Sequence, residues 1–198
     1  MIHRLAFCFA FVAKTVISIA ASILAQPLLA AEDPLQAEAR GVAMEFGQVL
    51  QKHLQSSMMT VGPSSSIRMC NAQAPAIAAQ LSQHTHWNVR RTSTKSRNQN
   101  NAPDGWESQI LATFQDKLAR GAPLENLEHG ELQIINGKKS YRYMKAIGIK
   151  EACLNCHGTH LSGEVRGVIK GFYPQDKATG YRLGELRGAF SMYKVLED

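Results

Sequence analysis

The pentapeptide Cys153-Leu154-Asn155-Cys156-His157, a C-x-x-C-H motif, restricts this chain more than any other feature of its sequence. On a helical turn, residues at positions i, i+3 and i+4 share one face. Two thiols placed in this way can bond to the two vinyl groups of one porphyrin, and the imidazole of His157 can then reach the iron. The motif therefore predicts a covalently bound haem c, attached through Cys153 and Cys156 and ligated by His157. Since the motif occurs once, we expect one haem.

Two other kinds of site use similar spacings. A structural zinc site would need a fourth ligand, which His160 could supply because it follows the motif closely. A thioredoxin-like dithiol would use Cys153 and Cys156, but it has no need of the histidine and normally occurs in a βα context that is not predicted here. The spacing and the adjacent histidine favour haem attachment over both.

Residues 1–31 have the features of a secretory signal peptide. A basic start at Arg4 precedes long apolar stretches, and the small residues Ala30 and Ala31 stand just before the first acidic residues. We expect cleavage near these alanines and export to the periplasm. The alternative is an uncleaved leader that anchors the chain in the membrane, although Lys14 interrupts the apolar run that an anchor requires.

Export makes the cysteine count informative. The sequence contains four cysteines, of which Cys8 lies in the leader and Cys153 and Cys156 would be used by the haem. Cys70 would then be a lone thiol in an oxidising compartment, where such a group is prone to oxidation or intermolecular pairing. A specific function of the Cys70 thiol is therefore expected.

The hydrophobic pattern predicts one α+β domain over residues 32–198, with helices first and an antiparallel sheet later. The predicted helices are 34–58, a second one that follows Gly62-Pro63 and is bent or restarted at Pro75, and a third capped by Asp104. The predicted strands are 87–93, 131–135, 138–147, 165–172 and 187–195. The pair Asn136-Gly137 is typical of a hairpin turn between two of these strands.

Four ordered segments resemble a known family: IRMCNAQAPAIA (67–78), RRTSTKSRNQNNAPDGWE (90–107), YRYMKAI…CLNCHG (141–158) and DKATGYRLGELRGAFSMY (176–193). They are similar to a c-type haem family that was long catalogued as a domain of unknown function. Its members resemble PAS-like haem sensor domains, which occur as a stand-alone cyanobacterial protein and as input modules of signalling proteins.

The resemblance covers most of the chain beyond the leader. It implies a PAS-like antiparallel sheet with flanking helices, preceded by a long N-terminal helix. It also implies that the axial ligands of the iron are His157 and a cysteine of a C-N-x-x-A-P block, which is Cys70 in this sequence. Sensor members of the family often continue into output domains, whereas this chain stops at Asp198, so signalling would need a separate partner.

Cys70 shares an apolar helical face with its neighbours, and without the resemblance it could simply be a buried structural cysteine. Other residues could serve as the sixth ligand: Met144, His160, His84 and His86. Met144 is expected in the core, and the histidines at 84 and 86 in a solvated loop. His160 lies too near the motif to reach the opposite face of a haem.

The densest basic segment contains Arg90, Arg91, Lys95 and Arg97. Arginine can bind a carboxylate through two hydrogen bonds, and a haem carries two propionates. We expect at least one of Arg90, Arg91 and Arg97 to contact a propionate, although such residues often only face water. The formal net charge is +6, but no run of Lys and Arg is dense enough to suggest a nucleic-acid surface. We therefore predict no nucleic-acid binding.

Three functions are consistent with these expectations. The first is a haem-based redox or small-gas sensor responding to NO, CO or O₂, and the second is a periplasmic electron-transfer cytochrome c. The third, a haem peroxidase-type enzyme, needs an open iron position and a polar acid–base pair. Ligation by Cys70 would fill that position, which counts against an enzyme without excluding catalysis. We therefore predict no enzymatic activity. The expected partners are a redox protein or membrane signalling protein and a diatomic gas, with membrane contact only through an uncleaved leader.

Overall fold

The computed structural model describes residues 32–197, so the predicted signal peptide lies outside the described residues. The elements are α1 (Pro34–Thr85), β1 (Asn88–Thr92), η1 (Gln99–Asn101), α2 (Gly105–Ala119), η2 (Leu124–Asn126), β2 (Glu128–Ile135), β3 (Lys138–Gly148), η3 (Glu151–Cys153), α3 (Leu154–His157), α4 (Gly163–Phe172) and β4 (Leu186–Val195). None of the helices within residues 32–197 combines the length and apolar character needed to cross a membrane.

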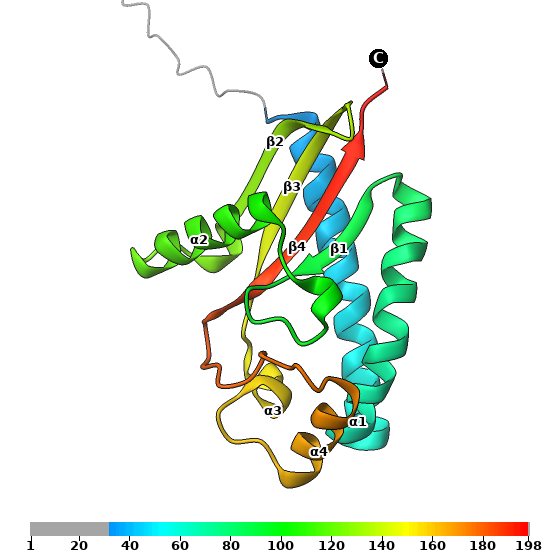
Figure 1. Cartoon of the computed structure of the whole chain (residues 1–198), viewed down its shortest axis with the longest axis vertical. Helices are drawn as coiled ribbons and strands as arrows, with labels where there is room; N and C mark the ends of the chain where they lie inside the picture. The colour runs from blue at the N-terminus through cyan, green and yellow to red at the C-terminus, as the bar shows by residue number, and fades with distance from the viewer. Residues whose placement is uncertain (1–31, 198) are drawn as a thin grey trace, which may run out of the picture. The chain divides into compact units, whose positions relative to one another are not determined.

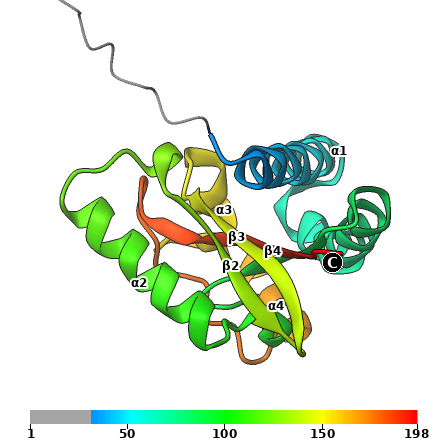
Figure 2. The same cartoon turned by 90° about the horizontal axis from the view of Figure 1, so that it is seen from above.

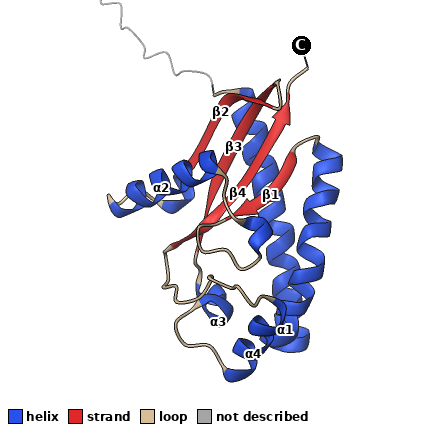
Figure 3. Cartoon of the chain, viewed as in Figure 1, coloured by secondary structure: helices blue, strands red, loops and turns tan. Residues whose placement is uncertain are grey.

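The sheet is built around the predicted hairpin. Asn136 and Gly137 both have positive φ, 51° and 77°, as the tight turn between β2 and β3 requires. β4 pairs antiparallel with β3, and β1 pairs antiparallel with β4, so that the strand order is β1-β4-β3-β2 (Figure 3). The long N-terminal helix, the flanking helices and the antiparallel sheet confirm the predicted α+β fold.

α1 is a helical hairpin rather than one straight helix. Its backbone leaves the helical conformation at Gly62, where φ is 75° and ψ is 177°. This break, predicted from Gly62-Pro63, separates a first arm (34–61) from a second arm (63–85), while the backbone stays helical through Pro75 (Figure 2). The arms are linked near the break, where the Ser57 and Ser66 hydroxyl oxygens lie 2.7 Å apart.

Helices cover both faces of the sheet (Figures 1 and 2). α1 packs on one face, and its apolar cluster is centred on Phe46, Trp87 and Tyr143. α2 packs on the other face around Phe114 and Met144, so the expected core position of Met144 is confirmed. Alternation along β3 explains the division, because successive strand residues point to opposite faces of a sheet.

The segment 165–172, predicted as a strand, is the helix α4. The correction has a simple reason, since its apolar residues recur at i, i+3, i+4 and i+7, which is the period of a helix. The hydroxyl of Ser162 caps the first turn by accepting a hydrogen bond from the Val165 amide at 3.2 Å. The buried Val165 and Ile169 then face α1, one turn apart.

A carboxylate fastens the first arm of α1 to the sheet. Glu128 at the start of β2 accepts hydrogen bonds from Arg40 Nε at 2.8 Å, from the Tyr143 hydroxyl at 2.6 Å and from Gln36 Nε2 at 3.0 Å. The pKa of Glu128 is lowered from 4.5 to about 2, mainly because Arg40 donates hydrogen bonds to its carboxylate. The ionised carboxylate therefore stabilises the fold.

Glu128→Gln is expected to lower the free energy of unfolding at pH 7 by about 1–3 kcal/mol. A carboxyl with a depressed pKa contributes stability above its unfolded pKa, and it loses that contribution as pH falls through its folded pKa. The difference between variant and wild type should therefore shrink from pH 5 towards pH 2 in urea titrations. Glu45→Gln, at an exposed position of the same helix, is the control. Equal stability of the Glu128 variant and wild type at pH 7 would contradict the expectation.

Candidate cofactor site

The C-x-x-C-H motif forms a short helical turn beyond the end of β3. Cys153 ends η3, and Cys156 and His157 follow in α3, so the three residues occupy one helical turn as the spacing predicts. α3 and α4 lie near the turn of the α1 hairpin, at one end of the sheet (Figure 1). Cys156 packs against an apolar cluster that joins Ile67 of the second α1 arm to α4.

The imidazole of His157 is held in the orientation and tautomer of a metal ligand. Its Nδ1 lies 2.6 Å from the Ala178 carbonyl oxygen, which can only accept, so Nδ1 carries the proton and Nε2 keeps a free lone pair. Burial, followed by the charges of Arg187 and Arg97, lowers the pKa of His157 to about 2. The ring of Tyr181 stands edge-on to it, with the centroids 6.3 Å apart.

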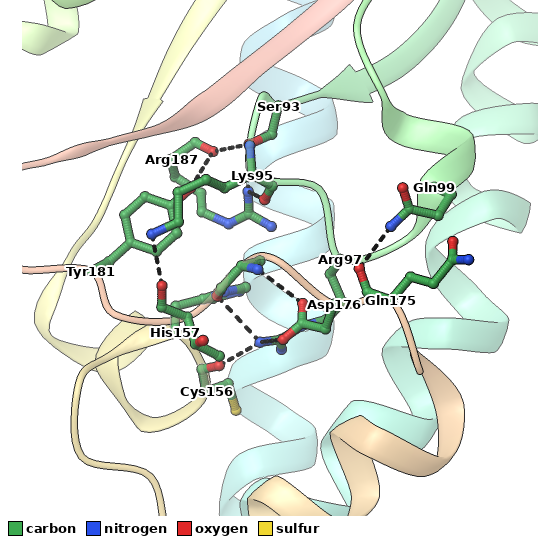
Figure 4. Close-up of polar contacts among 12 residues, drawn as sticks. Ser93, Lys95, Arg97, Gln99, Cys156, His157, Gln175, Asp176, Tyr181 and Arg187 are labelled. Carbon is green, nitrogen blue, oxygen red and sulfur yellow. Dashed lines mark hydrogen bonds and ion pairs between the residues drawn. The ribbon is translucent and has the colours of Figure 1, made fainter.

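Arg97 ties the motif to the loop before β4. Its Nε donates to Asp176 Oδ1 at 3.1 Å, and its Nη2 donates to the Cys156 carbonyl oxygen at 2.5 Å (Figure 4). The Asp176 carboxylate also accepts from the Ala178 amide at 3.0 Å, next to the carbonyl that orients His157. Arg97 thus helps to define the geometry of the site.

A second basic group lies beside Tyr181. Arg187 Nη1 donates to Ser93 Oγ at 2.9 Å and to the Lys95 carbonyl oxygen at 3.2 Å. The Lys95 ammonium lies 4.1 Å from the centre of the Tyr181 ring, and the Arg187 guanidinium lies 5.6 Å from it. Two cations therefore flank the aromatic ring that contacts His157.

Cys70 lies on the second arm of α1, within the influence of the same arginines. Burial raises the pKa of its thiol, while the charges of Arg91 and Arg97 oppose that effect. Burial also raises the pKa of Cys156, and the nearby Cys70 adds to the rise. The fold therefore brings Cys70, the motif, Arg91 and Arg97 together from segments far apart in the sequence.

Arg90 does not join this group. Its Nη2 donates to the carbonyl oxygens of Asn100 and Ala102, at 3.1 and 2.9 Å, and its Nη1 lies 3.7 Å from Glu107. Arg91 faces α1 while Arg90 points to the opposite face of the sheet, because neighbouring strand residues alternate, and the expected propionate contact of Arg90 stays a prediction.

The other residues considered as ligands lie elsewhere. Met144 is fully buried under α2, and His84 and His86 are exposed at the far end of the second α1 arm. His160 is exposed and its Nδ1 lies 2.9 Å from the Thr159 hydroxyl. Among residues 32–197, no group of three or more His, Cys, Asp or Glu side chains is placed to hold a metal ion.

Two residues of the site escaped the sequence analysis. Arg187 was assigned only to a strand, and Tyr181 only to a loop between strands. Tyr181 lies in a turn stretch that gives no periodic signal, and its amide donates to the His157 carbonyl oxygen at 2.9 Å. Arg187 could have been noticed as a charged residue at the start of a strand whose next residues, Gly188 to Phe190, are uncharged.

Comparison with known proteins identifies the kind of domain. The model of the Tll0287-like family matches residues 18–194 of this chain. A solved structure, described as the crystal structure of the cyanobacterial heme-protein Tll0287, is similar with a TM-score of 0.61 and 23% sequence identity. The similarity covers 84% of this chain and 98% of that one. A search of curated protein sequences found no match.

Proposed function

Because this chain belongs to the Tll0287-like family, we propose that it is an exported mono-haem c-type cytochrome that acts as a haem-based redox or small-gas sensor. The observation that carries the proposal is His157, which stands in a C-x-x-C-H turn with Nδ1 bound to a carbonyl and Nε2 free. Such an imidazole is prepared to ligate a metal. The heme-protein Tll0287, whose fold is similar, supports the choice of haem.

The chemistry of the surrounding residues fits this group. Cys153 and Cys156 would hold it by thioether bonds, and His157 and Cys70 would ligate its iron. The arginines around them match its two carboxylates in charge. When bound, haem supplies an iron that changes between ferric and ferrous states and can bind diatomic gases.

Cys70 is the residue through which a signal would reach the protein. As a ligand, its thiolate would favour the ferric over the ferrous state of the iron. A Cys70 that no longer held the cofactor would give CO, NO or O₂ access to the site and would leave the second α1 arm less restrained. That arm begins at the Gly62 break and leads into β1, so its movement can be passed to the sheet. A redox partner or a membrane signalling protein would read this change.

Electron transfer is the second candidate function. It is favoured by the exposure of Glu151, Ala152 and Asn155 in and beside the attachment turn, which would leave the cofactor edge near the surface. A carrier would keep Cys70 bound in both oxidation states. A peroxidase-type activity is the least favoured, and we propose that the protein is not an enzyme.

Carbon monoxide distinguishes a sensor from a carrier. We expect the dithionite-reduced protein to bind carbon monoxide and to give a new Soret maximum, because reduction weakens the bond to Cys70. The ferric protein should give no response, since carbon monoxide binds ferrous iron. Absorption spectra with and without the gas provide the measurement. A reduced protein that is inert to carbon monoxide would favour the electron carrier.

Export is expected with cleavage near Ala30 or Ala31. The basic start, the apolar stretches and the small residues before Glu32 are the reasons. Intact-mass analysis of the protein from a periplasmic fraction should give the mass of a chain that lacks about its first thirty residues and carries one haem. A full-length chain retained in the membrane would instead indicate an uncleaved anchor.

A further inference from the structure

The cluster around His157 contains more positive charge than its described residues neutralise. Arg91, Arg97 and Arg187 all lie close enough to affect the pKa of His157. One carboxylate, that of Asp176, belongs to the cluster, and it pairs with Arg97. Within residues 32–197, neither Arg91 nor Arg187 forms an ion pair with an acidic side chain.

The hydrogen bonds of the two unpaired arginines leave donors free. Arg187 donates through Nη1 to Ser93 and to the Lys95 carbonyl, and its side chain also hydrogen-bonds to Tyr181, so at least two of its five N–H donors have no partner among the described residues. Arg91 donates no hydrogen bond to any residue in the described part of the chain. A guanidinium has five N–H donors, and a partly buried one without a counter-charge is costly. Both arginines therefore present free donors in a place where an anion would be stabilised.

The backbone brings these two arginines to the same end of the sheet. Arg91 lies in β1 and Arg187 begins β4, and Thr92 pairs with Ala189 between them. The strands approach closely at Gly188, where φ is 152° and an added Cβ would lie 2.2 Å from the Thr92 carbonyl oxygen. Glycine at this position therefore permits the spacing that sets Arg187 beside Ser93 and near His157.

We infer that Arg91 and Arg187 bind the two carboxylates of one dianionic ligand. Arg97 instead pairs with Asp176, and Arg90 does not contact the ligand. The inference rests on the proposed function, because haem supplies that dianion through its two propionates. Two guanidiniums with free donors match two carboxylates, and a guanidinium can bind a carboxylate bidentately. Arg97 instead holds the loop that carries Ala178.

The test compares haemin with its dimethyl ester, which lacks the two charges. In the full chain carrying Cys153→Ala and Cys156→Ala, both compounds can be titrated spectrophotometrically without covalent attachment. We expect haemin to bind at least about tenfold more tightly than the ester, because charge-assisted hydrogen bonds to carboxylates are stronger than those to neutral groups. Arg91→Gln and Arg187→Gln should each reduce this preference, and the double variant should abolish it. Arg90→Gln is the matched control and should keep the full preference.

The outcomes separate the inference from the proposed function. A preference that survives in both Arg91→Gln and Arg187→Gln, or one lost only in Arg97→Gln, would overturn the inference while leaving haem binding intact. Failure of the protein with its native cysteines to acquire any haem would overturn the proposed function itself.

A second measurement applies if the double cysteine variant does not fold. In the covalently loaded protein, Arg187→Gln should lower the midpoint potential relative to Arg90→Gln, because it removes a positive charge that favours ferrous iron. The potential should also become dependent on pH between about 5 and 7, as an unpaired propionate titrates. Identical potentials and pH profiles in the two variants would contradict the role of Arg187.

Discussion

Replacing Cys153 and Cys156 together by alanine will abolish covalent retention of haem. The reason is chemical, since each thioether needs one of these thiols, and no other cysteine stands at the required spacing. In cells that contain the cytochrome c maturation machinery, wild-type protein should give a band in denaturing gels stained for haem peroxidase activity. The double variant should give none, and acid acetone should extract any haem that it holds.

Cys70→Ala is the matched control for this experiment, because it also removes a partly buried thiol but not an attachment point. It should keep the stained band. A stained band in the Cys153/Cys156 variant would show that another group holds the haem, and the assignment of the motif would then be wrong.

Cys70→Ser should shift the Soret band of the ferric protein and raise its reduction potential. The thiolate is a strong donor that stabilises ferric iron, and a serine hydroxyl is a much weaker one. Axial ligands change haem potentials over about 0.8 V, so we expect a rise on the order of 100 mV. Absorption spectroscopy and a spectroelectrochemical titration provide the two measurements.

His84→Ala is a suitable control, since His84 lies on the same arm of α1 but is exposed at its far end. Its spectra and potential should match those of the wild type. An unchanged ferric spectrum in Cys70→Ser would exclude Cys70 as a ligand, and the second arm would then lose its proposed part in signalling.

The sequence was most informative where one local signal decides the structure. Asn136-Gly137 identified the central hairpin, Gly62-Pro63 the break in α1, and Asp104 the cap of α2, which the structure shows as a reciprocal capping box with Glu107. The error at 165–172 had a local cause too, because its valines and isoleucine suggested a strand although their spacing was helical.

The site was predictable only in part, because much of it depends on pairing between distant segments. The spacing of the motif was sufficient to place Cys153, Cys156 and His157 on one turn. Alternation along the strand could have separated Arg91 from Arg90. Nothing local, however, indicates that the Ala178 carbonyl would orient His157. That contact joins the end of α3 to a loop without regular structure, between residues 21 positions apart.

The distribution of apolar and charged residues has a consequence for the order in which the protein folds and acquires its cofactor. The two clusters that cover the faces of the sheet contain neither the motif nor Cys70, so the sheet can form with α1 and α2 before any cofactor arrives. The other end must instead gather three guanidinium charges around one carboxylate, and their mutual repulsion opposes its closure. We therefore expect the newly made chain to have a folded sheet, covered by α1 and α2, while the attachment turn remains open. Enzymes that join haem to Cys153 and Cys156 would then reach both thiols, and the arriving carboxylates would close the arginines around the product.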